Sequence, residues 1–393
     1  MISLEDYAGR EQAYVKHVFL ANYLERLIHK TASTYNHIAY VDGFAGPWQS
    51  ANEQYGDTSF GIALAALRSA KASWRKLGRD VRMSAHLVER DPKAYARLQE
   101  FAAKFPDLDI KTYNLDFVDA AESIVKAIPA QAFAFFFIDP KGWRIRIQSI
   151  ATMLSRPNSE VVFNFMFDFI NRAASMQDPK IAQGLDELIT QGDWRKKLLL
   201  LGEAERSDST SDIRKSVLIS GFSETLSKVG QYPFVAETEV LRPLRDRTLY
   251  YLMYATRHPI GVEVFRDCQV EALRRQSSAR AGVKLQTTQR ETGQSELFSL
   301  HEMSPDKTEK FLADEKAAAV SELLARVPLA PDFVRYGDVQ MAALTRHVVR
   351  ATDLNAAAAE LYRQGRLVFP DWTPRKKIPD VEYRVQRRTA DLF

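Results

Sequence analysis

The sequence holds one cysteine and no long apolar run. Because Cys268 stands alone among 393 residues, an intramolecular disulfide framework and a cysteine-rich metal site are excluded, and a reducing compartment is indicated. No stretch approaches the roughly 20 apolar residues of a membrane span, and the first residues, "MISLEDYAGREQAY", lack a signal-peptide core. The seven histidines are scattered without ligand spacing, so no metal site is expected. These absences predict a cytoplasmic protein without a membrane anchor.

The composition is that of a globular chain with a small positive charge. Hydrophobic residues make up 46% and charged residues 26%, which suits a chain that buries a substantial core. A net charge of +4 permits an anionic partner without requiring one. The length exceeds that of one ordinary domain, so we expect a core domain with an appended module.

Strand and helix patterns alternate along the first part of the chain. Apolar runs end in acids or turn residues at residues 37–42, 84–91, 109–116, 132–140 and 160–167, with helical patterns between them. Such strands favour a parallel sheet covered on both faces. Two further runs, 232–241 and 248–258, predict an antiparallel pair at one edge. The expected fold is therefore α/β, with a mostly parallel sheet of seven strands arranged as in Rossmann-like methyltransferases.

The remaining chain predicts an appended module. We expect the core domain to span residues 1–272. Residues 273–300 are basic and poor in large apolar groups, which predicts a linker, and residues 301–393 show the helix and strand order of a winged helix. Arg375, Lys376 and Lys377 would form a basic wing tip that docks on nucleic-acid phosphates. The alternative, given equal weight, is that this module packs on the core domain or on a protein partner.

The stretch "YVDGFAGPW" identifies the first candidate site. A nucleotide-phosphate loop would need G-x-G-x-x-G and a helix, but Pro47 and Trp48 follow Gly46 where that helix should begin. S-adenosylmethionine has no phosphate and calls for carboxylates and close backbone approach. The candidate cofactor residues of this turn are Asp42, Gly43, Phe44 and Gly46. The alternative is a turn without a ligand.

Acids at the next two strand ends extend this candidate site. Glu89 has the character needed to accept bonds from both ribose hydroxyls, and Asp116 is placed to bind the adenine amino group. Each has an alternative as an acid or cap at a helix N-terminus. Lys16, on the first helix, is a candidate contact for the methionine carboxylate, or else lies on a solvated face. Ligand sites of parallel sheets lie at these strand ends, so the acids support one another.

The fourth strand carries the candidate chemistry, because "FFFIDPKGW" delivers an Asp-Pro pair from an apolar run to the same edge. Amino methyltransferases of the D-P-P-Y type use such an acid and the next carbonyl to bind a planar amino group beneath an aromatic ring. Asp139 and Pro140 would take these roles, and Trp143 would supply the ring. The alternative is a strand-end turn with Trp143 in the core. Asn164 either lines this edge or bonds to the backbone.

Taken together, these motifs resemble the three-Cys-motif partner (TcmP) family of bacterial proteins. The resemblance covers roughly residues 10 to 270, through "KHVFLANYL", "YVDGFAGPW", "GDTSFGIALAAL", "LVERDPKAYARL", "NLDF" and "FFFIDPKGW". It implies a Rossmann-like S-adenosylmethionine-dependent methyltransferase and a companion protein with a three-cysteine motif. It carries over the cofactor turn at Asp42, Gly43 and Gly46, the ribose acid Glu89, the adenine-side Asp116, and the catalytic turn Asp139 and Pro140.

The resulting functional hypothesis is a methyltransferase that modifies a nucleic-acid base. A second hypothesis is a catalytically silent binding protein that uses the same fold within a defence or mobile-element system. A third is a methyltransferase that acts on a small molecule or a protein, with the C-terminal module binding a partner chain.

Overall fold

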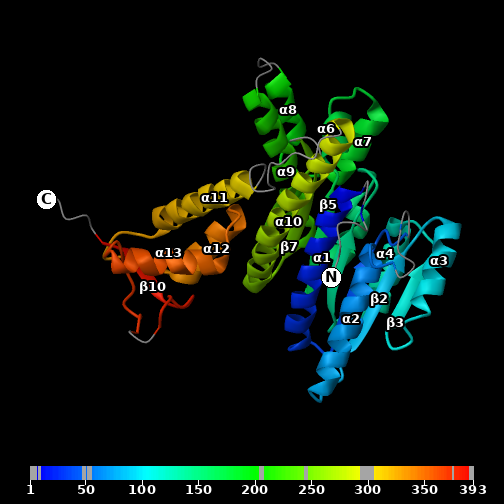
Figure 1. Ribbon diagram of the computed structural model, residues 1–393, viewed down its shortest axis with the longest axis horizontal. Helices are drawn as coiled ribbons and strands as arrows, with labels where there is room; N and C mark the ends of the chain where they lie inside the picture. Colours follow the sequence, from blue (N-terminus) through cyan, green and yellow to red (C-terminus); the bar gives the residue numbers. More distant parts are fainter. Residues whose placement is uncertain are drawn as a thin grey trace. The chain divides into compact units, whose positions relative to one another are not determined.

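The chain divides into two units in the computed structural model, Met1–Arg257 and His258–Phe393. The structure describes residues 7, 10–46, 50, 55–202, 208–242, 247–292, 305–373 and 376–388. The first unit contains a large sheet with helices on both faces, and the second contains helices and a small sheet (Figure 1). The expected boundary at residue 272 therefore differs from the division that the structure shows.

Seven strands of the first unit form one sheet in the order β3-β2-β1-β4-β5-β7-β6. Only β7 runs antiparallel to its neighbours in this sheet, so the predicted mostly parallel α/β architecture is confirmed. The central strands are apolar because helices cover both faces, and all six residues of β4 are buried. The bounds are β1 His37–Asp42, β2 Arg82–Val88, β3 Asp109–Tyr113, β4 Phe133–Ile138, β5 Ser159–Phe165, β6 Phe234–Leu241 and β7 Thr248–Thr256.

Two groups of helices cover this sheet. Helices α1 (Glu11–Ala32) and α2 (Ser59–Lys76) lie side by side on one face (Figure 1), and α3 (Pro92–Ala102) packs beside α2 through Phe60 and Phe101. The other face is covered by α4 (Phe117–Ala127), η2 (Ile147–Ile150), α5 (Ala151–Leu154) and α9 (Asp208–Gly230). Helices α6 (Phe167–Ala173), α7 (Pro179–Leu188) and α8 (Trp194–Gly202) follow β5. Each parallel strand thus ends at the same edge of the sheet, where the connections to the helices begin.

The second unit is helical with a small antiparallel sheet. Its helices are α10 (Pro259–Thr292), α11 (Pro305–Arg326), α12 (Tyr336–Arg346) and α13 (Ala351–Arg363). The strands β8 (Val334–Arg335), β9 (Leu367–Val368) and β10 (Arg384–Arg387) pair in the order β8-β10-β9. A buried guanidinium, that of Arg266, donates to the carbonyl oxygens of Leu344 (2.7 Å) and Thr345 (3.0 Å) and so ties α10 to the end of α12.

The predicted basic linker at residues 273–300 is corrected in part. Residues 273–292 continue α10, and residues 293–300 lie outside the described residues. The stretch lacks proline, and its alanines, arginines, lysines and glutamines have high helix propensity, so a shortage of large apolar groups does not break the helix. Within the described part of the chain, no helix is long and apolar enough to cross a membrane.

Candidate ligand-binding site

A cavity of about 950 Å³ lies at the carboxyl edge of the large sheet, within the first unit. It brings together residues from α1 and from the ends of β1, β2, β4 and β5, which are far apart in the sequence. The predicted site residues that line it are Lys16, Gly43, Phe44, Gly46, Glu89, Asp116, Asp139, Pro140 and Trp143. Asp42 is the predicted cofactor residue that does not line the cavity.

At the end of β1, the Asp42 carboxylate is fully buried and fully engaged by the protein. Its Oδ1 accepts the backbone N–H of Phe44 (3.0 Å), and its Oδ2 accepts the hydroxyls of Ser59 (2.6 Å) and Tyr40 (3.1 Å). Burial raises the pKa of Asp42 to about 6. Asp42, a predicted cofactor residue, thus lies behind the cavity lining, and its carboxylate holds the turn that follows β1.

The turn itself carries an aromatic pair that faces the cavity. The rings of Phe44 and Phe117 lie 5.6 Å apart between centroids, and both residues line the cavity. A Cβ atom on Gly43 would come within 2.8 Å of the Phe117 ring, so any side chain at this position would force that ring to shift. The next backbone contact, from the Ala45 N–H to the Val88 carbonyl (2.8 Å), ties the turn to the end of β2.

At the end of β2, Glu89 is buried, but only one of its two carboxylate oxygens has a hydrogen-bond partner among the described residues. Its Oε1 accepts the backbone N–H of Asp91 at 2.6 Å, while its Oε2 is buried without a hydrogen-bond partner among the described residues. Burial raises the pKa of this carboxyl group. The side chain of Asn114 donates to the carbonyl oxygens of Glu89 (2.9 Å) and Arg90 (3.0 Å) and fixes the backbone here. A buried acceptor without a donor, on a residue that lines a cavity, is a place for a ligand hydrogen bond.

Asp116 caps a helix, as one of its two interpretations predicts. Its Oδ1 accepts the backbone N–H of Val118 at 3.3 Å, at the start of α4, and its Oδ2 lies 3.5 Å from Arg90. The residue still lines the cavity, at its rim. The neighbouring Phe117 was not predicted as a site residue, although an aromatic directly after a strand-end acid is a signal for it.

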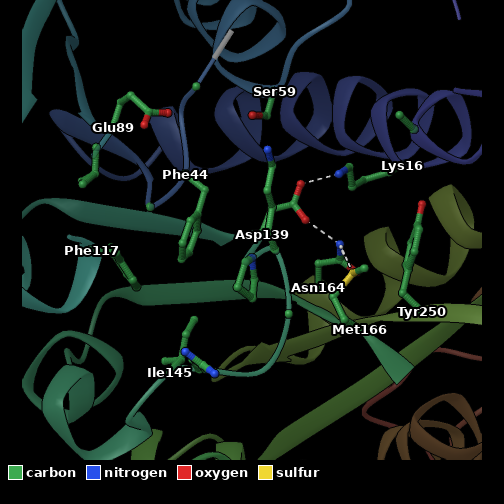
Figure 2. A pocket seen from close by; sticks show the side chains of 18 of the residues that line it. Lys16, Phe44, Ser59, Glu89, Phe117, Asp139, Ile145, Asn164, Met166 and Tyr250 are labelled. Atoms are coloured by element: carbon green, nitrogen blue, oxygen red, sulfur yellow. Dashed lines mark hydrogen bonds and ion pairs between the residues drawn. The ribbon is translucent and has the colours of Figure 1, made fainter. Parts of the chain in front are cut away.

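Asp139 lies between two partners at the centre of the site (Figure 2). Its Oδ2 forms an ion pair with the Lys16 ammonium, and its Oδ1 accepts a hydrogen bond from Asn164 Nδ2 at 2.5 Å. The Lys16 side chain lines the cavity and is not on a solvated face, and its ammonium pairs with Asp139. The Asn164 Oδ1 atom is buried without a hydrogen-bond partner among the described residues.

Trp143 is half-buried and contacts both of the environments predicted for it, the cavity and the apolar core. The side chain lines the cavity and also packs against the apolar core beneath β4 and β5. Its indole nitrogen lies 3.2 Å from the position that a Cβ on Gly184 would occupy, so α7 passes close to the ring. Pro140 and Gly142, which has a φ of +131°, shape the turn that carries Trp143 from β4 into the cavity wall.

The cavity has two ends of different character. Figure 2 shows Glu89, Phe44 and Phe117 on one side of Asp139, and Asn164, Met166 and Tyr250 on the other. We call the first the Glu89 end and the second the Tyr250 end. Phe169 and Arg242 also line the cavity. Of this Tyr250 end, the sequence indicated Asn164 alone, as a residue that either lines the edge or bonds to the backbone. Met166 and Tyr250 gave no signal, because they come from the turn after β5 and from the separate β6–β7 hairpin.

The predicted wing tip lies in the second unit. Arg375 lies outside the described residues, and Lys376 and Lys377 are exposed. The Lys376 ammonium pairs with Asp380 at 2.7 Å, so Lys377 is the described lysine of this tip with its charge least engaged. Within the described residues, no group of three or more histidine, cysteine, aspartate or glutamate side chains is arranged to hold a metal ion.

Comparison with known proteins gives little further information. No family model and no curated protein matches the chain. Among solved structures, a crystal structure of a protein from Legionella pneumophila str. Philadelphia 1, described with the family model DUF519, matches with a TM-score of 0.35 and 10% identity. The match covers 61% of this chain and 84% of that chain. Similarity at this level carries no information about function.

Proposed function

We propose that this chain is an S-adenosylmethionine-dependent methyltransferase that acts on a nucleic-acid base. The observation that carries the proposal is the buried Glu89 Oε2 atom, which has no hydrogen-bond partner among the described residues although Glu89 lines the cavity. A free carboxylate oxygen at this place suits the hydroxyls of a ribose. The strand order adds support, because seven strands ending in an antiparallel pair are the arrangement of Rossmann-like methyltransferases.

The rest of the Glu89 end fits the other parts of this cofactor. Phe44 and Phe117 offer ring faces to a flat adenine, and Asp116 lies at the rim beside them. Gly43 allows the close approach of Phe117 to the turn. The absence of a phosphate-binding glycine loop agrees with a cofactor that has no phosphate. When bound, S-adenosylmethionine supplies a methyl group carried on a sulfonium.

Asp139 is the residue that we assign to the substrate. Its carboxylate oxygens are acceptors for the N–H of a planar amino group and for the proton that the group loses, and Trp143 is placed to contact the ring. Lys16 and Asn164 hold this carboxylate in position in the structure, and each of its oxygens keeps a second lone pair that can accept from a substrate amino group. Lys16 and Asn164 are therefore positioning residues.

The second unit is the part that we assign to partner binding. Its elements follow one another in the order α11, β8, α12, α13, β9 and β10, which is the element order of a winged helix. The exposed Lys377 suits a contact with a phosphate. A companion protein with a three-cysteine motif remains part of the proposal through the family resemblance. The single cysteine, Cys268, is buried, which suits a cytoplasmic protein.

A second candidate function is a silent binding protein. It is favoured by the contacts of both Asp139 oxygens, since each already has a partner within the protein, Lys16 or Asn164. Methyl transfer from labelled cofactor to single-stranded DNA and to total RNA separates the two. If wild type transfers methyl groups and Asp139→Ala does not, while binding cofactor equally well, the enzyme is supported. Transfer by neither protein, with cofactor bound by both, supports the silent platform.

Calorimetry tests the cofactor directly. Wild type should bind S-adenosylmethionine or its demethylated product, and Glu89→Ala should weaken binding by about 1 to 3 kcal/mol, the scale of lost bonds to a charged group. The matched control is Glu122→Ala, because Glu122 is an exposed acid on α4 that pairs with Lys126 and does not line the cavity. Equal binding by wild type and Glu89→Ala, or tighter binding of NADP than of S-adenosylmethionine, would show that the assignment is wrong.

A further inference from the structure

Arginines that the proposed roles of Glu89 and Asp139 do not use lie beside the Tyr250 end of the cavity, where Arg242 is part of the lining. Arg172 on α6 and Arg242 and Arg247, which flank the β6–β7 connection, all lie against the carboxylate of Asp168. The ion-pair distances from Asp168 are 3.1 Å to Arg172, 2.6 Å to Arg242 and 2.8 Å to Arg247. The backbone N–H of Arg242 donates to the carbonyl of Arg247 at 2.9 Å, which holds the two close together. We call Arg172, Arg242 and Arg247 the arginine cluster.

The charge of this cluster is not balanced by its carboxylate. Among the described residues, three guanidinium groups share this one acid, which leaves an excess of two positive charges there. The Asp168 side chain is 2% exposed, whereas the arginine side chains are 38% to 54% exposed. Each guanidinium has five N–H donors, of which the carboxylate can engage only some. The cluster therefore presents cationic donors to solvent beside the cavity, where a further anion would relieve their mutual repulsion.

An exposed aromatic ring adjoins the cluster. Phe169 is 43% exposed and lines the cavity, and the Arg172 guanidinium lies over its ring at 4.9 Å from the centroid. Arg242 lines the same cavity. A single exposed phenylalanine needs no explanation, but a ring beside unbalanced arginines at a cavity mouth has a specific use. Proteins that bind single-stranded nucleic acid stack bases on such rings and hold the phosphates with cations.

We propose that Phe169 and the arginine cluster bind the unpaired nucleotide next to the base that enters the cavity. The base of that nucleotide stacks on Phe169, and its phosphate is held by Arg242 and Arg247. The inference rests on the proposed function for the identity of the target base. It adds that the substrate is single-stranded, or is opened at the target, because Asp139 lies inside the cavity and a paired base cannot reach it.

The test is binding of a short fluorescein-labelled single-stranded oligodeoxynucleotide of mixed sequence, measured by anisotropy with the full chain over a range of salt concentrations. The double variant Arg242→Gln/Arg247→Gln should bind about tenfold more weakly. The slope of log affinity against log salt should fall by about 0.7 for each phosphate that the variant no longer neutralises. Circular dichroism melting shows that each variant is folded.

The matched control is Arg68→Gln. Arg68 is an exposed arginine of the same unit that pairs with Asp107 and lies over the Phe105 ring at 4.0 Å, but it does not line the cavity. It repeats the chemistry of the arginine cluster at another place. Wild-type affinity and slope are expected for this variant. An equal loss for each positive charge removed in Arg68→Gln and in the double variant would overturn the proposal, because the effect would then be one of net charge.

Phe169→Leu separates stacking from charge. Leucine keeps the apolar character but removes the ring face, so affinity for the single strand should fall about tenfold with an unchanged salt slope. A duplex of the same sequence should bind Phe169→Leu and wild type alike. Wild-type affinity for the single strand in both the Phe169 and the double arginine variants would overturn the proposal. An RNA strand of the same sequence identifies which nucleic acid the surface prefers.

Titration of the wild-type chain with S-adenosylmethionine tests the proposed function independently of the oligonucleotide-binding surface. A chain that loses oligonucleotide binding in these variants but never binds S-adenosylmethionine would contradict the methyltransferase and leave this surface in place. A chain that binds the cofactor through Glu89 but shows no change in the arginine and Phe169 variants would contradict this surface alone.

Discussion

The ends of β1 and β2 both carry a buried acid, but the two acids are satisfied to different degrees. Asp42 accepts three hydrogen bonds from protein groups, from Phe44, Ser59 and Tyr40. Glu89, one strand away, accepts one on Oε1 and none on Oε2 among the described residues. Both pKa values are raised by burial, so the protein disfavours the charged form at each place. The two acids differ in the number of hydrogen-bond donors that offset the cost of burying the charged form.

This difference separates a structural acid from a candidate ligand acid. Position at the end of a parallel strand does not decide the role, because both residues have it. A buried carboxylate whose oxygens are all engaged stabilises the turn around it, whereas one with an idle oxygen leaves a cost that a ligand can remove. We therefore expect substitutions at Asp42 to act on folding and substitutions at Glu89 to act on ligand binding.

The largest effect is expected for Asp42→Ala. The change leaves the Phe44 N–H and the Ser59 and Tyr40 hydroxyls without their acceptor in a fully buried place. At about 1 to 3 kcal/mol for each of the three unsatisfied groups, the free energy of unfolding should fall by at least about 3 kcal/mol, measured by urea denaturation. Asp42→Asn is the control, because its amide oxygen still accepts from Phe44. A loss below about 1 kcal/mol for Asp42→Ala would assign this acid to the ligand instead.

The next effect is a pH dependence that comes from Asp42. Its pKa is about 6 in the folded chain and about 3.9 in the unfolded chain, so the folded state binds the extra proton between these values. Stability from this group is fully present below about pH 4 and is lost as the pH rises through about 6. Relative to Asp42→Asn, the wild type should lose about 3 kcal/mol of unfolding free energy between pH 4 and pH 7. Parallel curves for the two proteins would contradict this.

The same comparison shows how far the sequence could predict this site. Apolar runs that end in acids predicted the strands and placed Asp42, Glu89, Asp116 and Asp139 at one edge, because parallel strands end together. They could not predict which acid is satisfied, since Asp42 depends on Ser59, 17 residues away, and Asp139 depends on Lys16, 123 residues away. They also could not predict the arginine cluster, because a hairpin brings Arg242 and Arg247 to a carboxylate that lies 74 residues before Arg242.

The smallest effect on stability is expected for Glu89→Gln, and its small size makes it informative. The glutamine amide oxygen can still accept from the Asp91 N–H, so the β2 turn is kept. The change replaces a buried charge that lacks a partner on one oxygen with a neutral group of the same shape. Because burial disfavours the charged form, the unfolding free energy at pH 7 should stay within about 1 kcal/mol of the wild-type value, on the stabilised side. Cofactor affinity should fall in the same protein, because an amide nitrogen cannot accept from a ribose hydroxyl. Urea denaturation and calorimetry on one preparation therefore measure the two roles separately. A fall in stability as large as that of Asp42→Ala would make Glu89 a second structural acid and would remove the distinction between the two strand ends.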